Sequence, residues 1–542
     1  MNAPSAAKPP DVVLITPPFV QLNAPYAATP ALAGWLEANG VSVMQRDLSL
    51  EVALDALRVW GDDFTDEAIE ILQNRHLPPE AKEEVTRYVD DLALRIRDEV
   101  DPDFGFSRYA EKLCAALPDF GALLKRLRRR SPVDRLLEAR VDALLDELGA
   151  HVPVFGVTCP FPGTLLGAFR IAAAIRRRLP EARIALGGGY VNTELRDMTD
   201  GRPRRFFDAI LFDEGYGPLL DRLVAWGAAP REAAGREAPP FVKPSYRGID
   251  LSRYLDLPES ANPMHRLWST GRWLKVQLAR GCYWHKCAFC DVNLEYVKCF
   301  RMPRAETVAD ALEALARETG EANFHFTDEA MPPALVAGLS REIVRRKFKC
   351  SWWGNVRFDA AFTPALARLM ARAGCIAVSG GLECANDRLL KLMNKGITRK
   401  SARAALEAFA SAGIMAHAYL MYAFPTETER EARGALAWVR DLFRAGLVQS
   451  AFFHRFALTV HSPVARDPAK FGIETPDWKR PPEKPRFALN EIPFREPGAP
   501  DWDRIGKALE LALYNYVEGR GLSKPASFWF GKRPVSRRSS RP

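Results

Sequence analysis

No apolar run in this sequence approaches the ~20 residues that a helix needs to cross a bilayer. The chain begins with MNAPSAAKPP, which lacks the basic-then-apolar pattern of a secretory signal. The 9 cysteines are an odd number scattered through 542 residues, which is unlike a disulfide framework. We therefore expect a cytoplasmic protein with no membrane partner, in which clustered cysteines bind metal.

A net charge of +9 does not by itself predict a nucleic-acid-binding surface, because much of the basic character gathers in short runs. Solvated helix faces and chain ends explain such runs better than a binding surface does. Nucleic acid is therefore not an expected partner. The runs are Lys125 to Arg130, Arg176 to Arg178, and a tail containing Lys532, Arg533, Arg537, Arg538 and Arg541.

The length of the chain exceeds what one hydrophobic core usually organises, so we expect several domains. Residues 10–226 alternate short apolar strands with helical segments, which predicts an α/β domain with a Rossmann-like parallel sheet. Residues 51–148 interrupt this pattern with helical periodicity and heavy charge, and we expect a helical insertion there. Ligands of such sheets bind at the carboxyl ends of the strands.

The remaining chain predicts a linker, a partial barrel and a small C-terminal extension. Residues 227–272 are rich in proline, glycine and charge, as in a linker. Residues 273–465 contain six apolar strand candidates, which predict a partial (β/α)6 barrel with its chemistry at the carboxyl ends of the strands. Residues 466–542 combine a proline-rich stretch, one clear helix and the basic tail. The strand candidates are WLKVQLA, ANFHFTD, FKCSWWG, CIAVSGG, MAHAYLMYA and SAFFHRF.

The segment ARGCYWHKCAFCDVN places Cys282, Cys287 and Cys290 directly after the first barrel strand. Cysteine thiolates are the usual protein ligands of iron–sulfur clusters, and one loop with this spacing can bind a single [4Fe-4S] cluster. Three thiolates leave one iron without a protein ligand. The amino and carboxylate groups of S-adenosylmethionine (SAM) can chelate that iron, so that an electron from the cluster breaks a carbon–sulfur bond.

The alternative is a structural zinc site with His285 or Cys299 as the fourth ligand. Zinc sites more often show a second paired ligand group, whereas Cys299 stands alone in the sequence. The other cysteines lie mostly in apolar segments, where we expect packed small side chains. They are Cys114, Cys159, Cys350, Cys375 and Cys384.

With these motifs the sequence resembles the radical SAM superfamily, particularly its branch with an N-terminal cobalamin-binding domain. The resemblance covers residues 10–50 and 150–465, where FHFTDE, SGGLECANDRLLKLMNKGIT and LMYAFPTET follow the second, fourth and fifth strands in the order of that family. It implies a cobalamin-binding-type Rossmann domain followed by a radical SAM barrel. One departure is the four residues between Cys282 and Cys287, where the family usually has three; a bulge in the loop would absorb the extra residue.

The resemblance also implies a SAM-binding set. Asp328 and Glu329 would lie near the SAM amino group, with a helix N-cap as the alternative. Glu383 would accept hydrogen bonds from the ribose hydroxyls. Arg357 and Arg399 would meet the SAM carboxylate or Glu383, with surface ion pairs as the alternative. The full set is Phe289, Asp328, Glu329, Glu383, Arg399, and Phe424 with Pro425 against the adenine.

Three loops of the Rossmann-like domain, TPPF, TCPFPGTLLG and LGGGY, resemble those that surround cobalamin. No Asp-x-His-x-x-Gly sequence occurs, so cobalamin would bind without a lower histidine ligand, or the domain is a scaffold or substrate platform. We favour bound cobalamin. The implied contacts are Thr16, Pro17, Thr158, Thr164, Gly187, Gly188 and Gly189.

The function implied by the resemblance is reductive cleavage of SAM by a cobalamin-dependent methyltransferase. The expected substrate is a small molecule or peptide in natural-product biosynthesis, and the expected electron donor is flavodoxin or ferredoxin. One alternative is transfer of a 3-amino-3-carboxypropyl group from SAM to a soft acceptor such as trivalent arsenic. Another is a non-enzymatic zinc or iron–sulfur protein that binds nucleic acid.

Substrate contacts are expected at the far end of the barrel. His454, Arg455 and His461 lie at or after the sixth strand, where they face either a substrate or ordinary core and surface. Trp352 and Trp353 are consecutive on one strand, so one indole should face the barrel interior and the other the helices.

Overall fold

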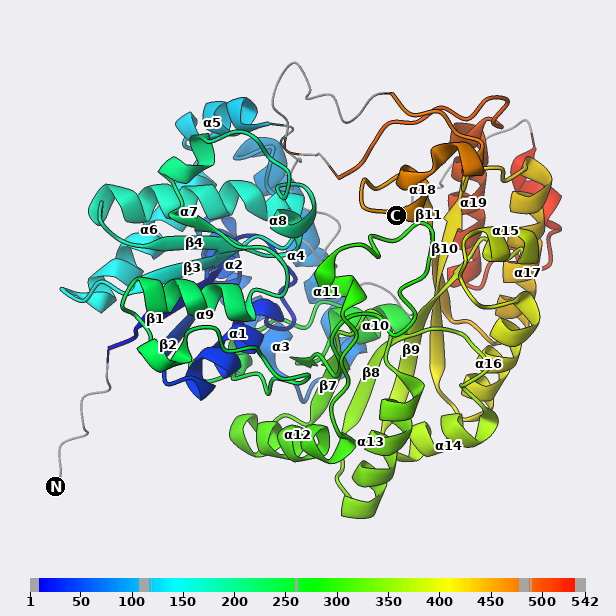
Figure 1. The fold of residues 1–542 in the computed structure, drawn as a ribbon, viewed down its shortest axis with the longest axis horizontal. Coiled ribbons are helices and arrows are strands. Elements are labelled where there is room, and N and C mark those ends of the chain that lie inside the picture. The colour runs from blue at the N-terminus through cyan, green and yellow to red at the C-terminus, as the bar shows by residue number, and fades with distance from the viewer. Residues whose placement is uncertain are drawn as a thin grey trace.

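The computed structural model describes residues 9–106, 117, 119–258, 262–476, 487 and 490–531. Two parallel sheets form separate lobes, with strand orders β2-β1-β3-β4-β5 and β11-β10-β9-β8-β7-β6 (Figure 1). The predicted α/β architecture, a Rossmann-like domain followed by a partial barrel, is confirmed. Cys114 and the basic tail from Lys532 onward lie outside the described residues.

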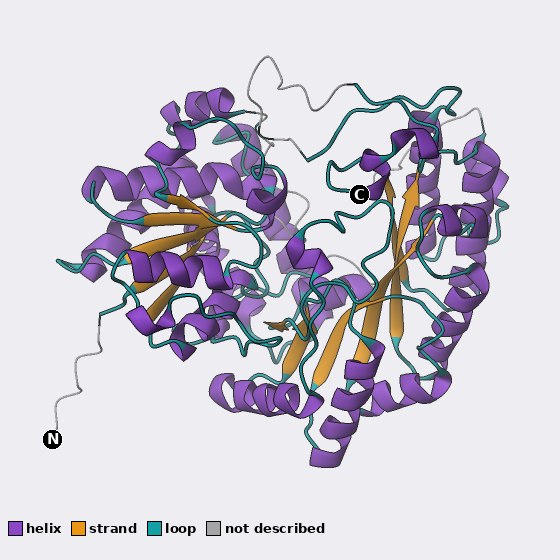
Figure 2. Cartoon of the chain, in the orientation of Figure 1, coloured by secondary structure: helices purple, strands orange, loops and turns teal. Residues whose placement is uncertain are grey.

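The N-terminal sheet is covered by helices on both faces (Figure 2). Its interior strand β1 is buried along its whole length and pairs in parallel with β2 and β3. Burial on both faces explains why VVLIT reads as a continuous apolar run. The strands are β1 (Val12–Thr16), β2 (Val43–Asp47), β3 (Val154–Thr158), β4 (Ile184–Gly187) and β5 (Ala209–Ile210), and the helices beside them are α1 (Ala28–Ala38), α7 (Leu165–Arg178), α8 (Gly189–Thr193) and α9 (Tyr216–Ala225).

The predicted helical insertion lies between β2 and β3. None of the described helices is long and apolar enough to cross a membrane.

Arg126 belongs to the basic run that was expected to be solvated, but it is largely buried. Its Nη1 lies 2.7 Å from Asp134 Oδ2, and Arg170 Nε lies 3.0 Å from Asp134 Oδ1. The first ion pair joins two helices of the insertion, and the second joins the insertion to α7. The insertion comprises α2 (Leu48–Trp60), α3 (Thr65–Gln73), α4 (Pro79–Glu99), α5 (Phe120–Arg128) and α6 (Pro132–Leu148).

The second sheet curves into a partial barrel with helices on its outer side (Figure 2). Trp352 packs on the helix side, where its Nε1 donates to Ala373 O at 2.8 Å. Trp353 packs on the opposite face, in a cluster with Met264 and Leu267. The two indoles therefore lie on opposite faces of the sheet. The strands are β6 (Leu274–Val276), β7 (Asn323–Phe326), β8 (Ser351–Val356), β9 (Cys375–Glu383), β10 (Met415–Tyr422) and β11 (Ser450–Arg455).

The barrel strands are connected through helices, as the length of their connections predicts. The short helix α10 (Pro263–Ser269) precedes β6, and the long helix α19 (Trp502–Val517) of the C-terminal extension packs against β11 and α17. The other helices are α11 (Glu295–Lys298), α12 (Ala305–Thr319), α13 (Pro333–Arg346), α14 (Pro364–Arg372), α15 (Asp387–Leu392), α16 (Arg399–Ser411), α17 (Glu429–Arg444) and α18 (Pro463–Arg466).

The linker of residues 227–272 packs against both lobes. The Tyr254 hydroxyl donates to Asp47 Oδ2 at 2.7 Å, at the end of β2. The Tyr246 hydroxyl accepts from Lys275 N at 2.5 Å and donates to Lys275 O at 3.0 Å, on the outer edge of β6. The linker therefore holds β6 at a fixed place beside the N-terminal domain.

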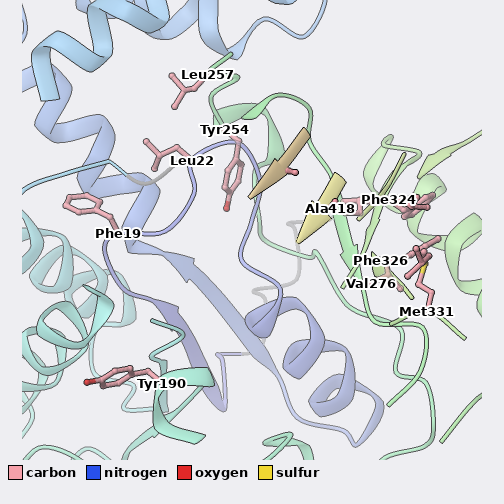
Figure 3. Packing of buried hydrophobic residues seen from close by; sticks show 14 of the residues in the cluster. Phe19, Leu22, Tyr190, Tyr254, Leu257, Val276, Phe324, Phe326, Met331 and Ala418 are labelled. Carbon is pink, nitrogen blue, oxygen red and sulfur yellow. The ribbon is translucent and has the colours of Figure 1, made fainter. Parts of the chain in front are cut away.

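One hydrophobic cluster runs through both lobes (Figure 3). It includes Phe19 and Leu22 from the N-terminal domain, Tyr254 and Leu257 from the linker, and Phe326 from the barrel. Because the same core is continuous across the linker, the carboxyl ends of the two sheets are held relative to one another.

Candidate functional site

The cysteine loop leaves the carboxyl end of β6. Cys287 is buried, Cys282 and Cys290 are partly exposed, and all three thiols are free. The loop turns at His285, whose φ of 33° lies in the left-handed region and whose Nδ1 lies 2.9 Å from Cys282 O. His285 lies within the longer spacing between the first two cysteines, so the extra residue is accommodated by this turn.

A second segment, residues 393–396 after α15, braces this loop. Ala288 N donates to Met393 O at 2.8 Å, and Trp284 Nε1 donates to Asn394 O at 2.8 Å. Gly396 has a φ of 73°, and a Cβ there would overlap the Trp284 indole. The cysteines are thus held against the loop that follows β9, although the two segments are far apart in sequence.

Two cations lie beside the buried thiol. Arg357, at the end of β8, places Nη1 4.0 Å from Cys287 Sγ and its guanidinium 4.5 Å from the centre of the Trp284 ring. A hydrogen bond from Cys290 and the charges of Lys395 and Arg357 lower the pKa of Cys287 to about 6 against the effect of burial. The surroundings thus favour a thiolate, the form that binds iron, at Cys287, while the same hydrogen bond raises the pKa of Cys290 well above its usual value.

The donor set fits an iron–sulfur cluster better than a zinc ion. Cys299 is exposed and its Sγ donates to Glu295 Oε2 at 3.0 Å, while His285 points one ring nitrogen at the loop backbone. Three free thiols on one loop with adjacent cations are the chemistry that an anionic cluster requires.

Glu383 and Lys395 form a buried ion pair at the carboxyl end of β9. Lys395 Nζ lies 2.6 Å from Glu383 Oε1, and the two side chains are 10% and 6% exposed. Burial lowers the pKa of His454, which lies on β11. The charges of Glu383 and Lys395 also act on this pKa, in opposite directions. Glu383, Lys395, Arg357 and His454 thus gather around the cysteine loop. Sequence reasoning missed Lys395, although it lies in the quoted segment LMNKGIT.

Asp328 is placed differently from the expectation. Its side chain is 2% exposed, and its two carboxylate oxygens accept hydrogen bonds from Leu278 N and Ala279 N, both at 2.8 Å. Burial raises the pKa of Asp328 to about 7. Neither it nor Glu329 caps a helix, because α13 begins at Pro333. Asp328 therefore fixes the start of the cysteine loop, and Glu329 is the exposed carboxylate of the two.

This assignment predicts different outcomes for the two neighbouring acids. Asp328→Ala leaves two buried backbone N–H groups without an acceptor, and we expect it to lower the free energy of unfolding by about 1–3 kcal/mol. Glu329→Ala is the matched control and should change it by less than about 0.5 kcal/mol. Chemical denaturation at neutral pH measures both variants. Equal effects of the two substitutions would contradict the positioning role of Asp328.

The other members of the expected SAM-binding set are dispersed. Phe289 lies at the loop with Lys395 Nζ 5.6 Å from its ring centre. Phe424 is fully buried among Phe456 and other aromatic rings, and Pro425 is buried beside it. Arg399 is exposed on α16, with its guanidinium over the Trp438 ring at 5.2 Å. The structure therefore places Arg399 on the surface, which was the alternative stated for it.

The carboxyl ends of the N-terminal strands border a cavity of about 340 Å³ that also reaches β6, β7 and α11 of the second lobe. Four of the expected cobalamin contacts line it: Thr158, Gly187, Gly188 and Gly189. The Thr158 Oγ1 is buried without a hydrogen-bond partner, so this wall has an unused polar group for a ligand.

The remaining three expected contacts lie elsewhere. Thr16 is buried outside the cavity lining, and Pro17 packs against Gly167 of α7. Thr164 is buried and donates to Phe161 O at 2.8 Å. Packing alone requires a glycine at position 188, since a Cβ there would lie 2.7 Å from Cys159 O. Gly187 carries no such packing constraint, since a Cβ there would meet nothing closer than 3.6 Å.

Of the three substrate candidates, His454 and His461 lie near the cysteine loop, where Asn293 Nδ2 donates to His461 O at 2.6 Å. Arg455 Nη1 pairs with Asp503 Oδ1 at 2.8 Å on the exposed surface. His461 Nε2 lies 3.6 Å from Asp197 Oδ2 of the N-terminal domain. These two residues are therefore assigned to surface and interdomain contacts.

Comparison with known proteins agrees with this geometry. Residues 276–439 match the Radical SAM superfamily model. A 169-residue stretch is 28% identical to an uncharacterized methyltransferase of Pyrococcus horikoshii and covers 31% of this chain and 36% of that protein. The chain spans about a third of the length of the curated relatives it matches.

Two solved structures share the fold over nearly the whole chain. The radical S-adenosylmethionine methyltransferase TsrM of Kitasatospora setae, with tryptophan substrate and a SAM analogue bound, has a TM-score of 0.55 at 17% identity and covers 93% of this chain and 88% of its own. The cobalamin-dependent S-adenosylmethionine radical enzyme OxsB has a TM-score of 0.54 at 13% identity, covering 93% and 66%. At these identities the likeness establishes the two-lobe architecture.

Proposed function

We propose that this chain, whose residues 276–439 belong to the radical SAM superfamily, is a cobalamin-dependent methyltransferase that cleaves SAM at a [4Fe-4S] cluster. The observation that carries the proposal is the loop of three free cysteines, braced by residues 393–396 and flanked by two cations. When bound, the cluster supplies the electron that breaks a carbon–sulfur bond of SAM.

The residues around the cluster loop have distinct roles in this proposal. Cys282, Cys287 and Cys290 hold the cluster, while Arg357 and Lys395 offset its negative charge. Glu383 presents a carboxylate to the ribose hydroxyls, held in place by Lys395. The accessible carboxylate of Glu329 meets the SAM ammonium group.

The interdomain cavity is the place proposed for cobalamin, which when bound supplies a methyl group. The unpartnered Thr158 hydroxyl and the open backbone at Gly187 fit a ligand with many polar groups. The lining includes Gln277 and Thr327 from the barrel, so the cavity reaches the carboxyl ends of β6 and β7. A small molecule or peptide of natural-product biosynthesis is the proposed substrate, consistent with the tryptophan bound by TsrM. Flavodoxin or ferredoxin as donor and a cytoplasmic location stay predictions.

Product analysis tests this proposal. Protein reconstituted anaerobically with iron, sulfide and hydroxocobalamin should show cluster and corrinoid absorbance. With reductant and SAM it should form 5′-deoxyadenosine, and with a methyl acceptor also S-adenosylhomocysteine. Methylthioadenosine as the main product would favour 3-amino-3-carboxypropyl transfer instead. Zinc in place of iron and sulfide, without SAM cleavage, would contradict the proposal.

A further inference from the structure

Three charged side chains line the interdomain cavity, and one of them has no counter-charge. Asp213 accepts from Arg196 Nη2 at 2.6 Å, and Glu214 accepts from Arg280 Nη1 at 2.6 Å. Lys275 is the third, and in the part of the chain that the structure describes no acceptor or anion contacts its Nζ. The cavity therefore contains one cation whose charge the protein leaves unbalanced.

The neighbours of Lys275 on the sheet supply no negative charge either. Its register neighbour on β7 is His325, which in turn pairs with Trp353 on β8. The His325 and Trp353 rings stack with centres 3.6 Å apart, and burial holds the pKa of His325 well below its usual range. Because Tyr246 fixes the backbone of Lys275 on the other side, the lysine stands on a held strand whose neighbour on the sheet carries the neutral His325 ring.

Lys275 is half-buried in the cavity wall, and an ammonium that is partly withdrawn from water without a partner destabilises a folded chain. Burial lowers the pKa of Lys275 to about 8, which leaves most molecules protonated at pH 7. An apolar side chain of similar length would cost less in the same place. A lysine is therefore expected here only if the ligand of the cavity brings the missing negative charge.

We propose that Lys275 binds an oxyanion, a carboxylate or phosphate group, carried by the ligand of the interdomain cavity. The neutral Gln277 amide and Tyr296 hydroxyl line the same cavity and can complete the recognition of such a group. The anion has two sources, the phosphodiester of a bound cobalamin or the carboxylate of a substrate. The inference rests on the proposed function only where cobalamin serves as a probe.

The experiment compares Lys275→Met, Lys275→Arg and the exposed control Lys400→Met, which removes the same charge from the surface of α16. Each is titrated with two ligand pairs, cobalamin against cobinamide, which lacks the phosphodiester together with its ribose and base, and benzoate against benzamide. We expect Lys275→Met to weaken binding of the member that carries the anion in one pair roughly 10- to 100-fold and to spare the member that lacks it. Lys275→Arg should retain most of the affinity, and Lys400→Met all of it.

Stability without ligand provides the second measurement. Ligand-free Lys275→Met should unfold at the same or a higher temperature than the wild type, because an unpaired, half-buried charge has been removed. In the titrations, a loss of affinity confined to cobalamin identifies the phosphodiester as the anion, and a loss confined to benzoate identifies a carboxylate. Equal changes for both members of each pair, or a less stable ligand-free Lys275→Met, would overturn the proposal. If the wild type binds no corrinoid, the cobalamin assignment fails, and the benzoate pair alone decides the role of Lys275.

Discussion

Cys287→Ala should remove most of the bound iron and reduce SAM cleavage by at least about 10³-fold. Without the cluster no electron reaches SAM, so the variant loses the source of an acceleration that in enzymes typically exceeds about 10⁶-fold. Cys287 is the buried member of the three thiols and the one beside Arg357, so neighbouring water cannot readily replace it. Iron and sulfide content, cluster absorbance and 5′-deoxyadenosine formation after anaerobic reconstitution measure the effect.

Two other cysteines provide matched controls. Cys350→Ala removes a partly buried thiol whose Sγ lies 3.7 Å from Ala373 O, away from the cysteine loop, and should retain iron and activity. Cys299→Ala removes the proposed fourth ligand of the zinc alternative and should also retain both. A Cys287→Ala protein with full iron content, or a Cys299→Ala protein without it, would contradict the assignment of the three cluster ligands.

Lys395→Met should lower the free energy of unfolding by about 3–5 kcal/mol, because it leaves the Glu383 carboxylate buried without its partner. The two side chains are only 10% and 6% exposed, so solvent cannot replace the lost ion pair. SAM cleavage should fall as well, since Lys395 also lies beside Cys287. Anaerobic chemical denaturation and the deoxyadenosine assay measure the two effects separately.

The double variant Lys395→Met with Glu383→Gln distinguishes stability from activity. Removing both charges should recover most of the lost stability, since no unpaired charge remains. It should not recover SAM cleavage, because the carboxylate proposed for the ribose is also gone. Recovery of both quantities would show that the pair is only structural, and recovery of neither would show that Lys395 stabilises the loop by other contacts.

The strands of this protein were predictable because both sheets are parallel and covered by helices. Such strands read as short apolar runs bounded by glycine, proline or polar residues, as in CIAVSGG, which forms most of β9 (Cys375–Glu383). The location of the cysteine loop followed from the same logic, since the motif begins where the apolar run of β6 ends. The positions of the strands therefore follow from the spacing of apolar residues and from the glycine, proline and polar residues that end each run.

Side-chain roles at the strand ends were less predictable. Asp328 and Glu329 are adjacent acids, yet one is satisfied by two backbone N–H groups and the other is exposed. Thr16 and Pro17 occupy the carboxyl end of β1 as expected but pack away from the cavity. Such outcomes depend on the direction in which each loop leaves its strand, which tertiary packing decides and local composition does not.

Lys395 and Lys275 show a second reason for incomplete prediction. Neither lysine belongs to a pattern with fixed ligand spacing, and lysine is common on any protein surface. The role of each lysine depends on what surrounds it in the fold. Lys395 lies beside Glu383 and Cys287, whereas no anion among the described residues contacts Lys275. Only the folded chain shows that one of these charges is balanced and the other is not.

The paired hydrogen bonds of Tyr246 to the backbone of Lys275 have a consequence for solubility. β6 is the outermost strand of its sheet, and such a strand offers free N–H and C=O groups to any other extended chain. The Tyr246 hydroxyl binds both the N–H and the C=O of Lys275, the middle residue of this three-residue strand. Another chain therefore cannot pair with β6 at that residue. A truncated protein that began at residue 273 would lose Tyr246. We would expect it to self-associate through the exposed edge of β6.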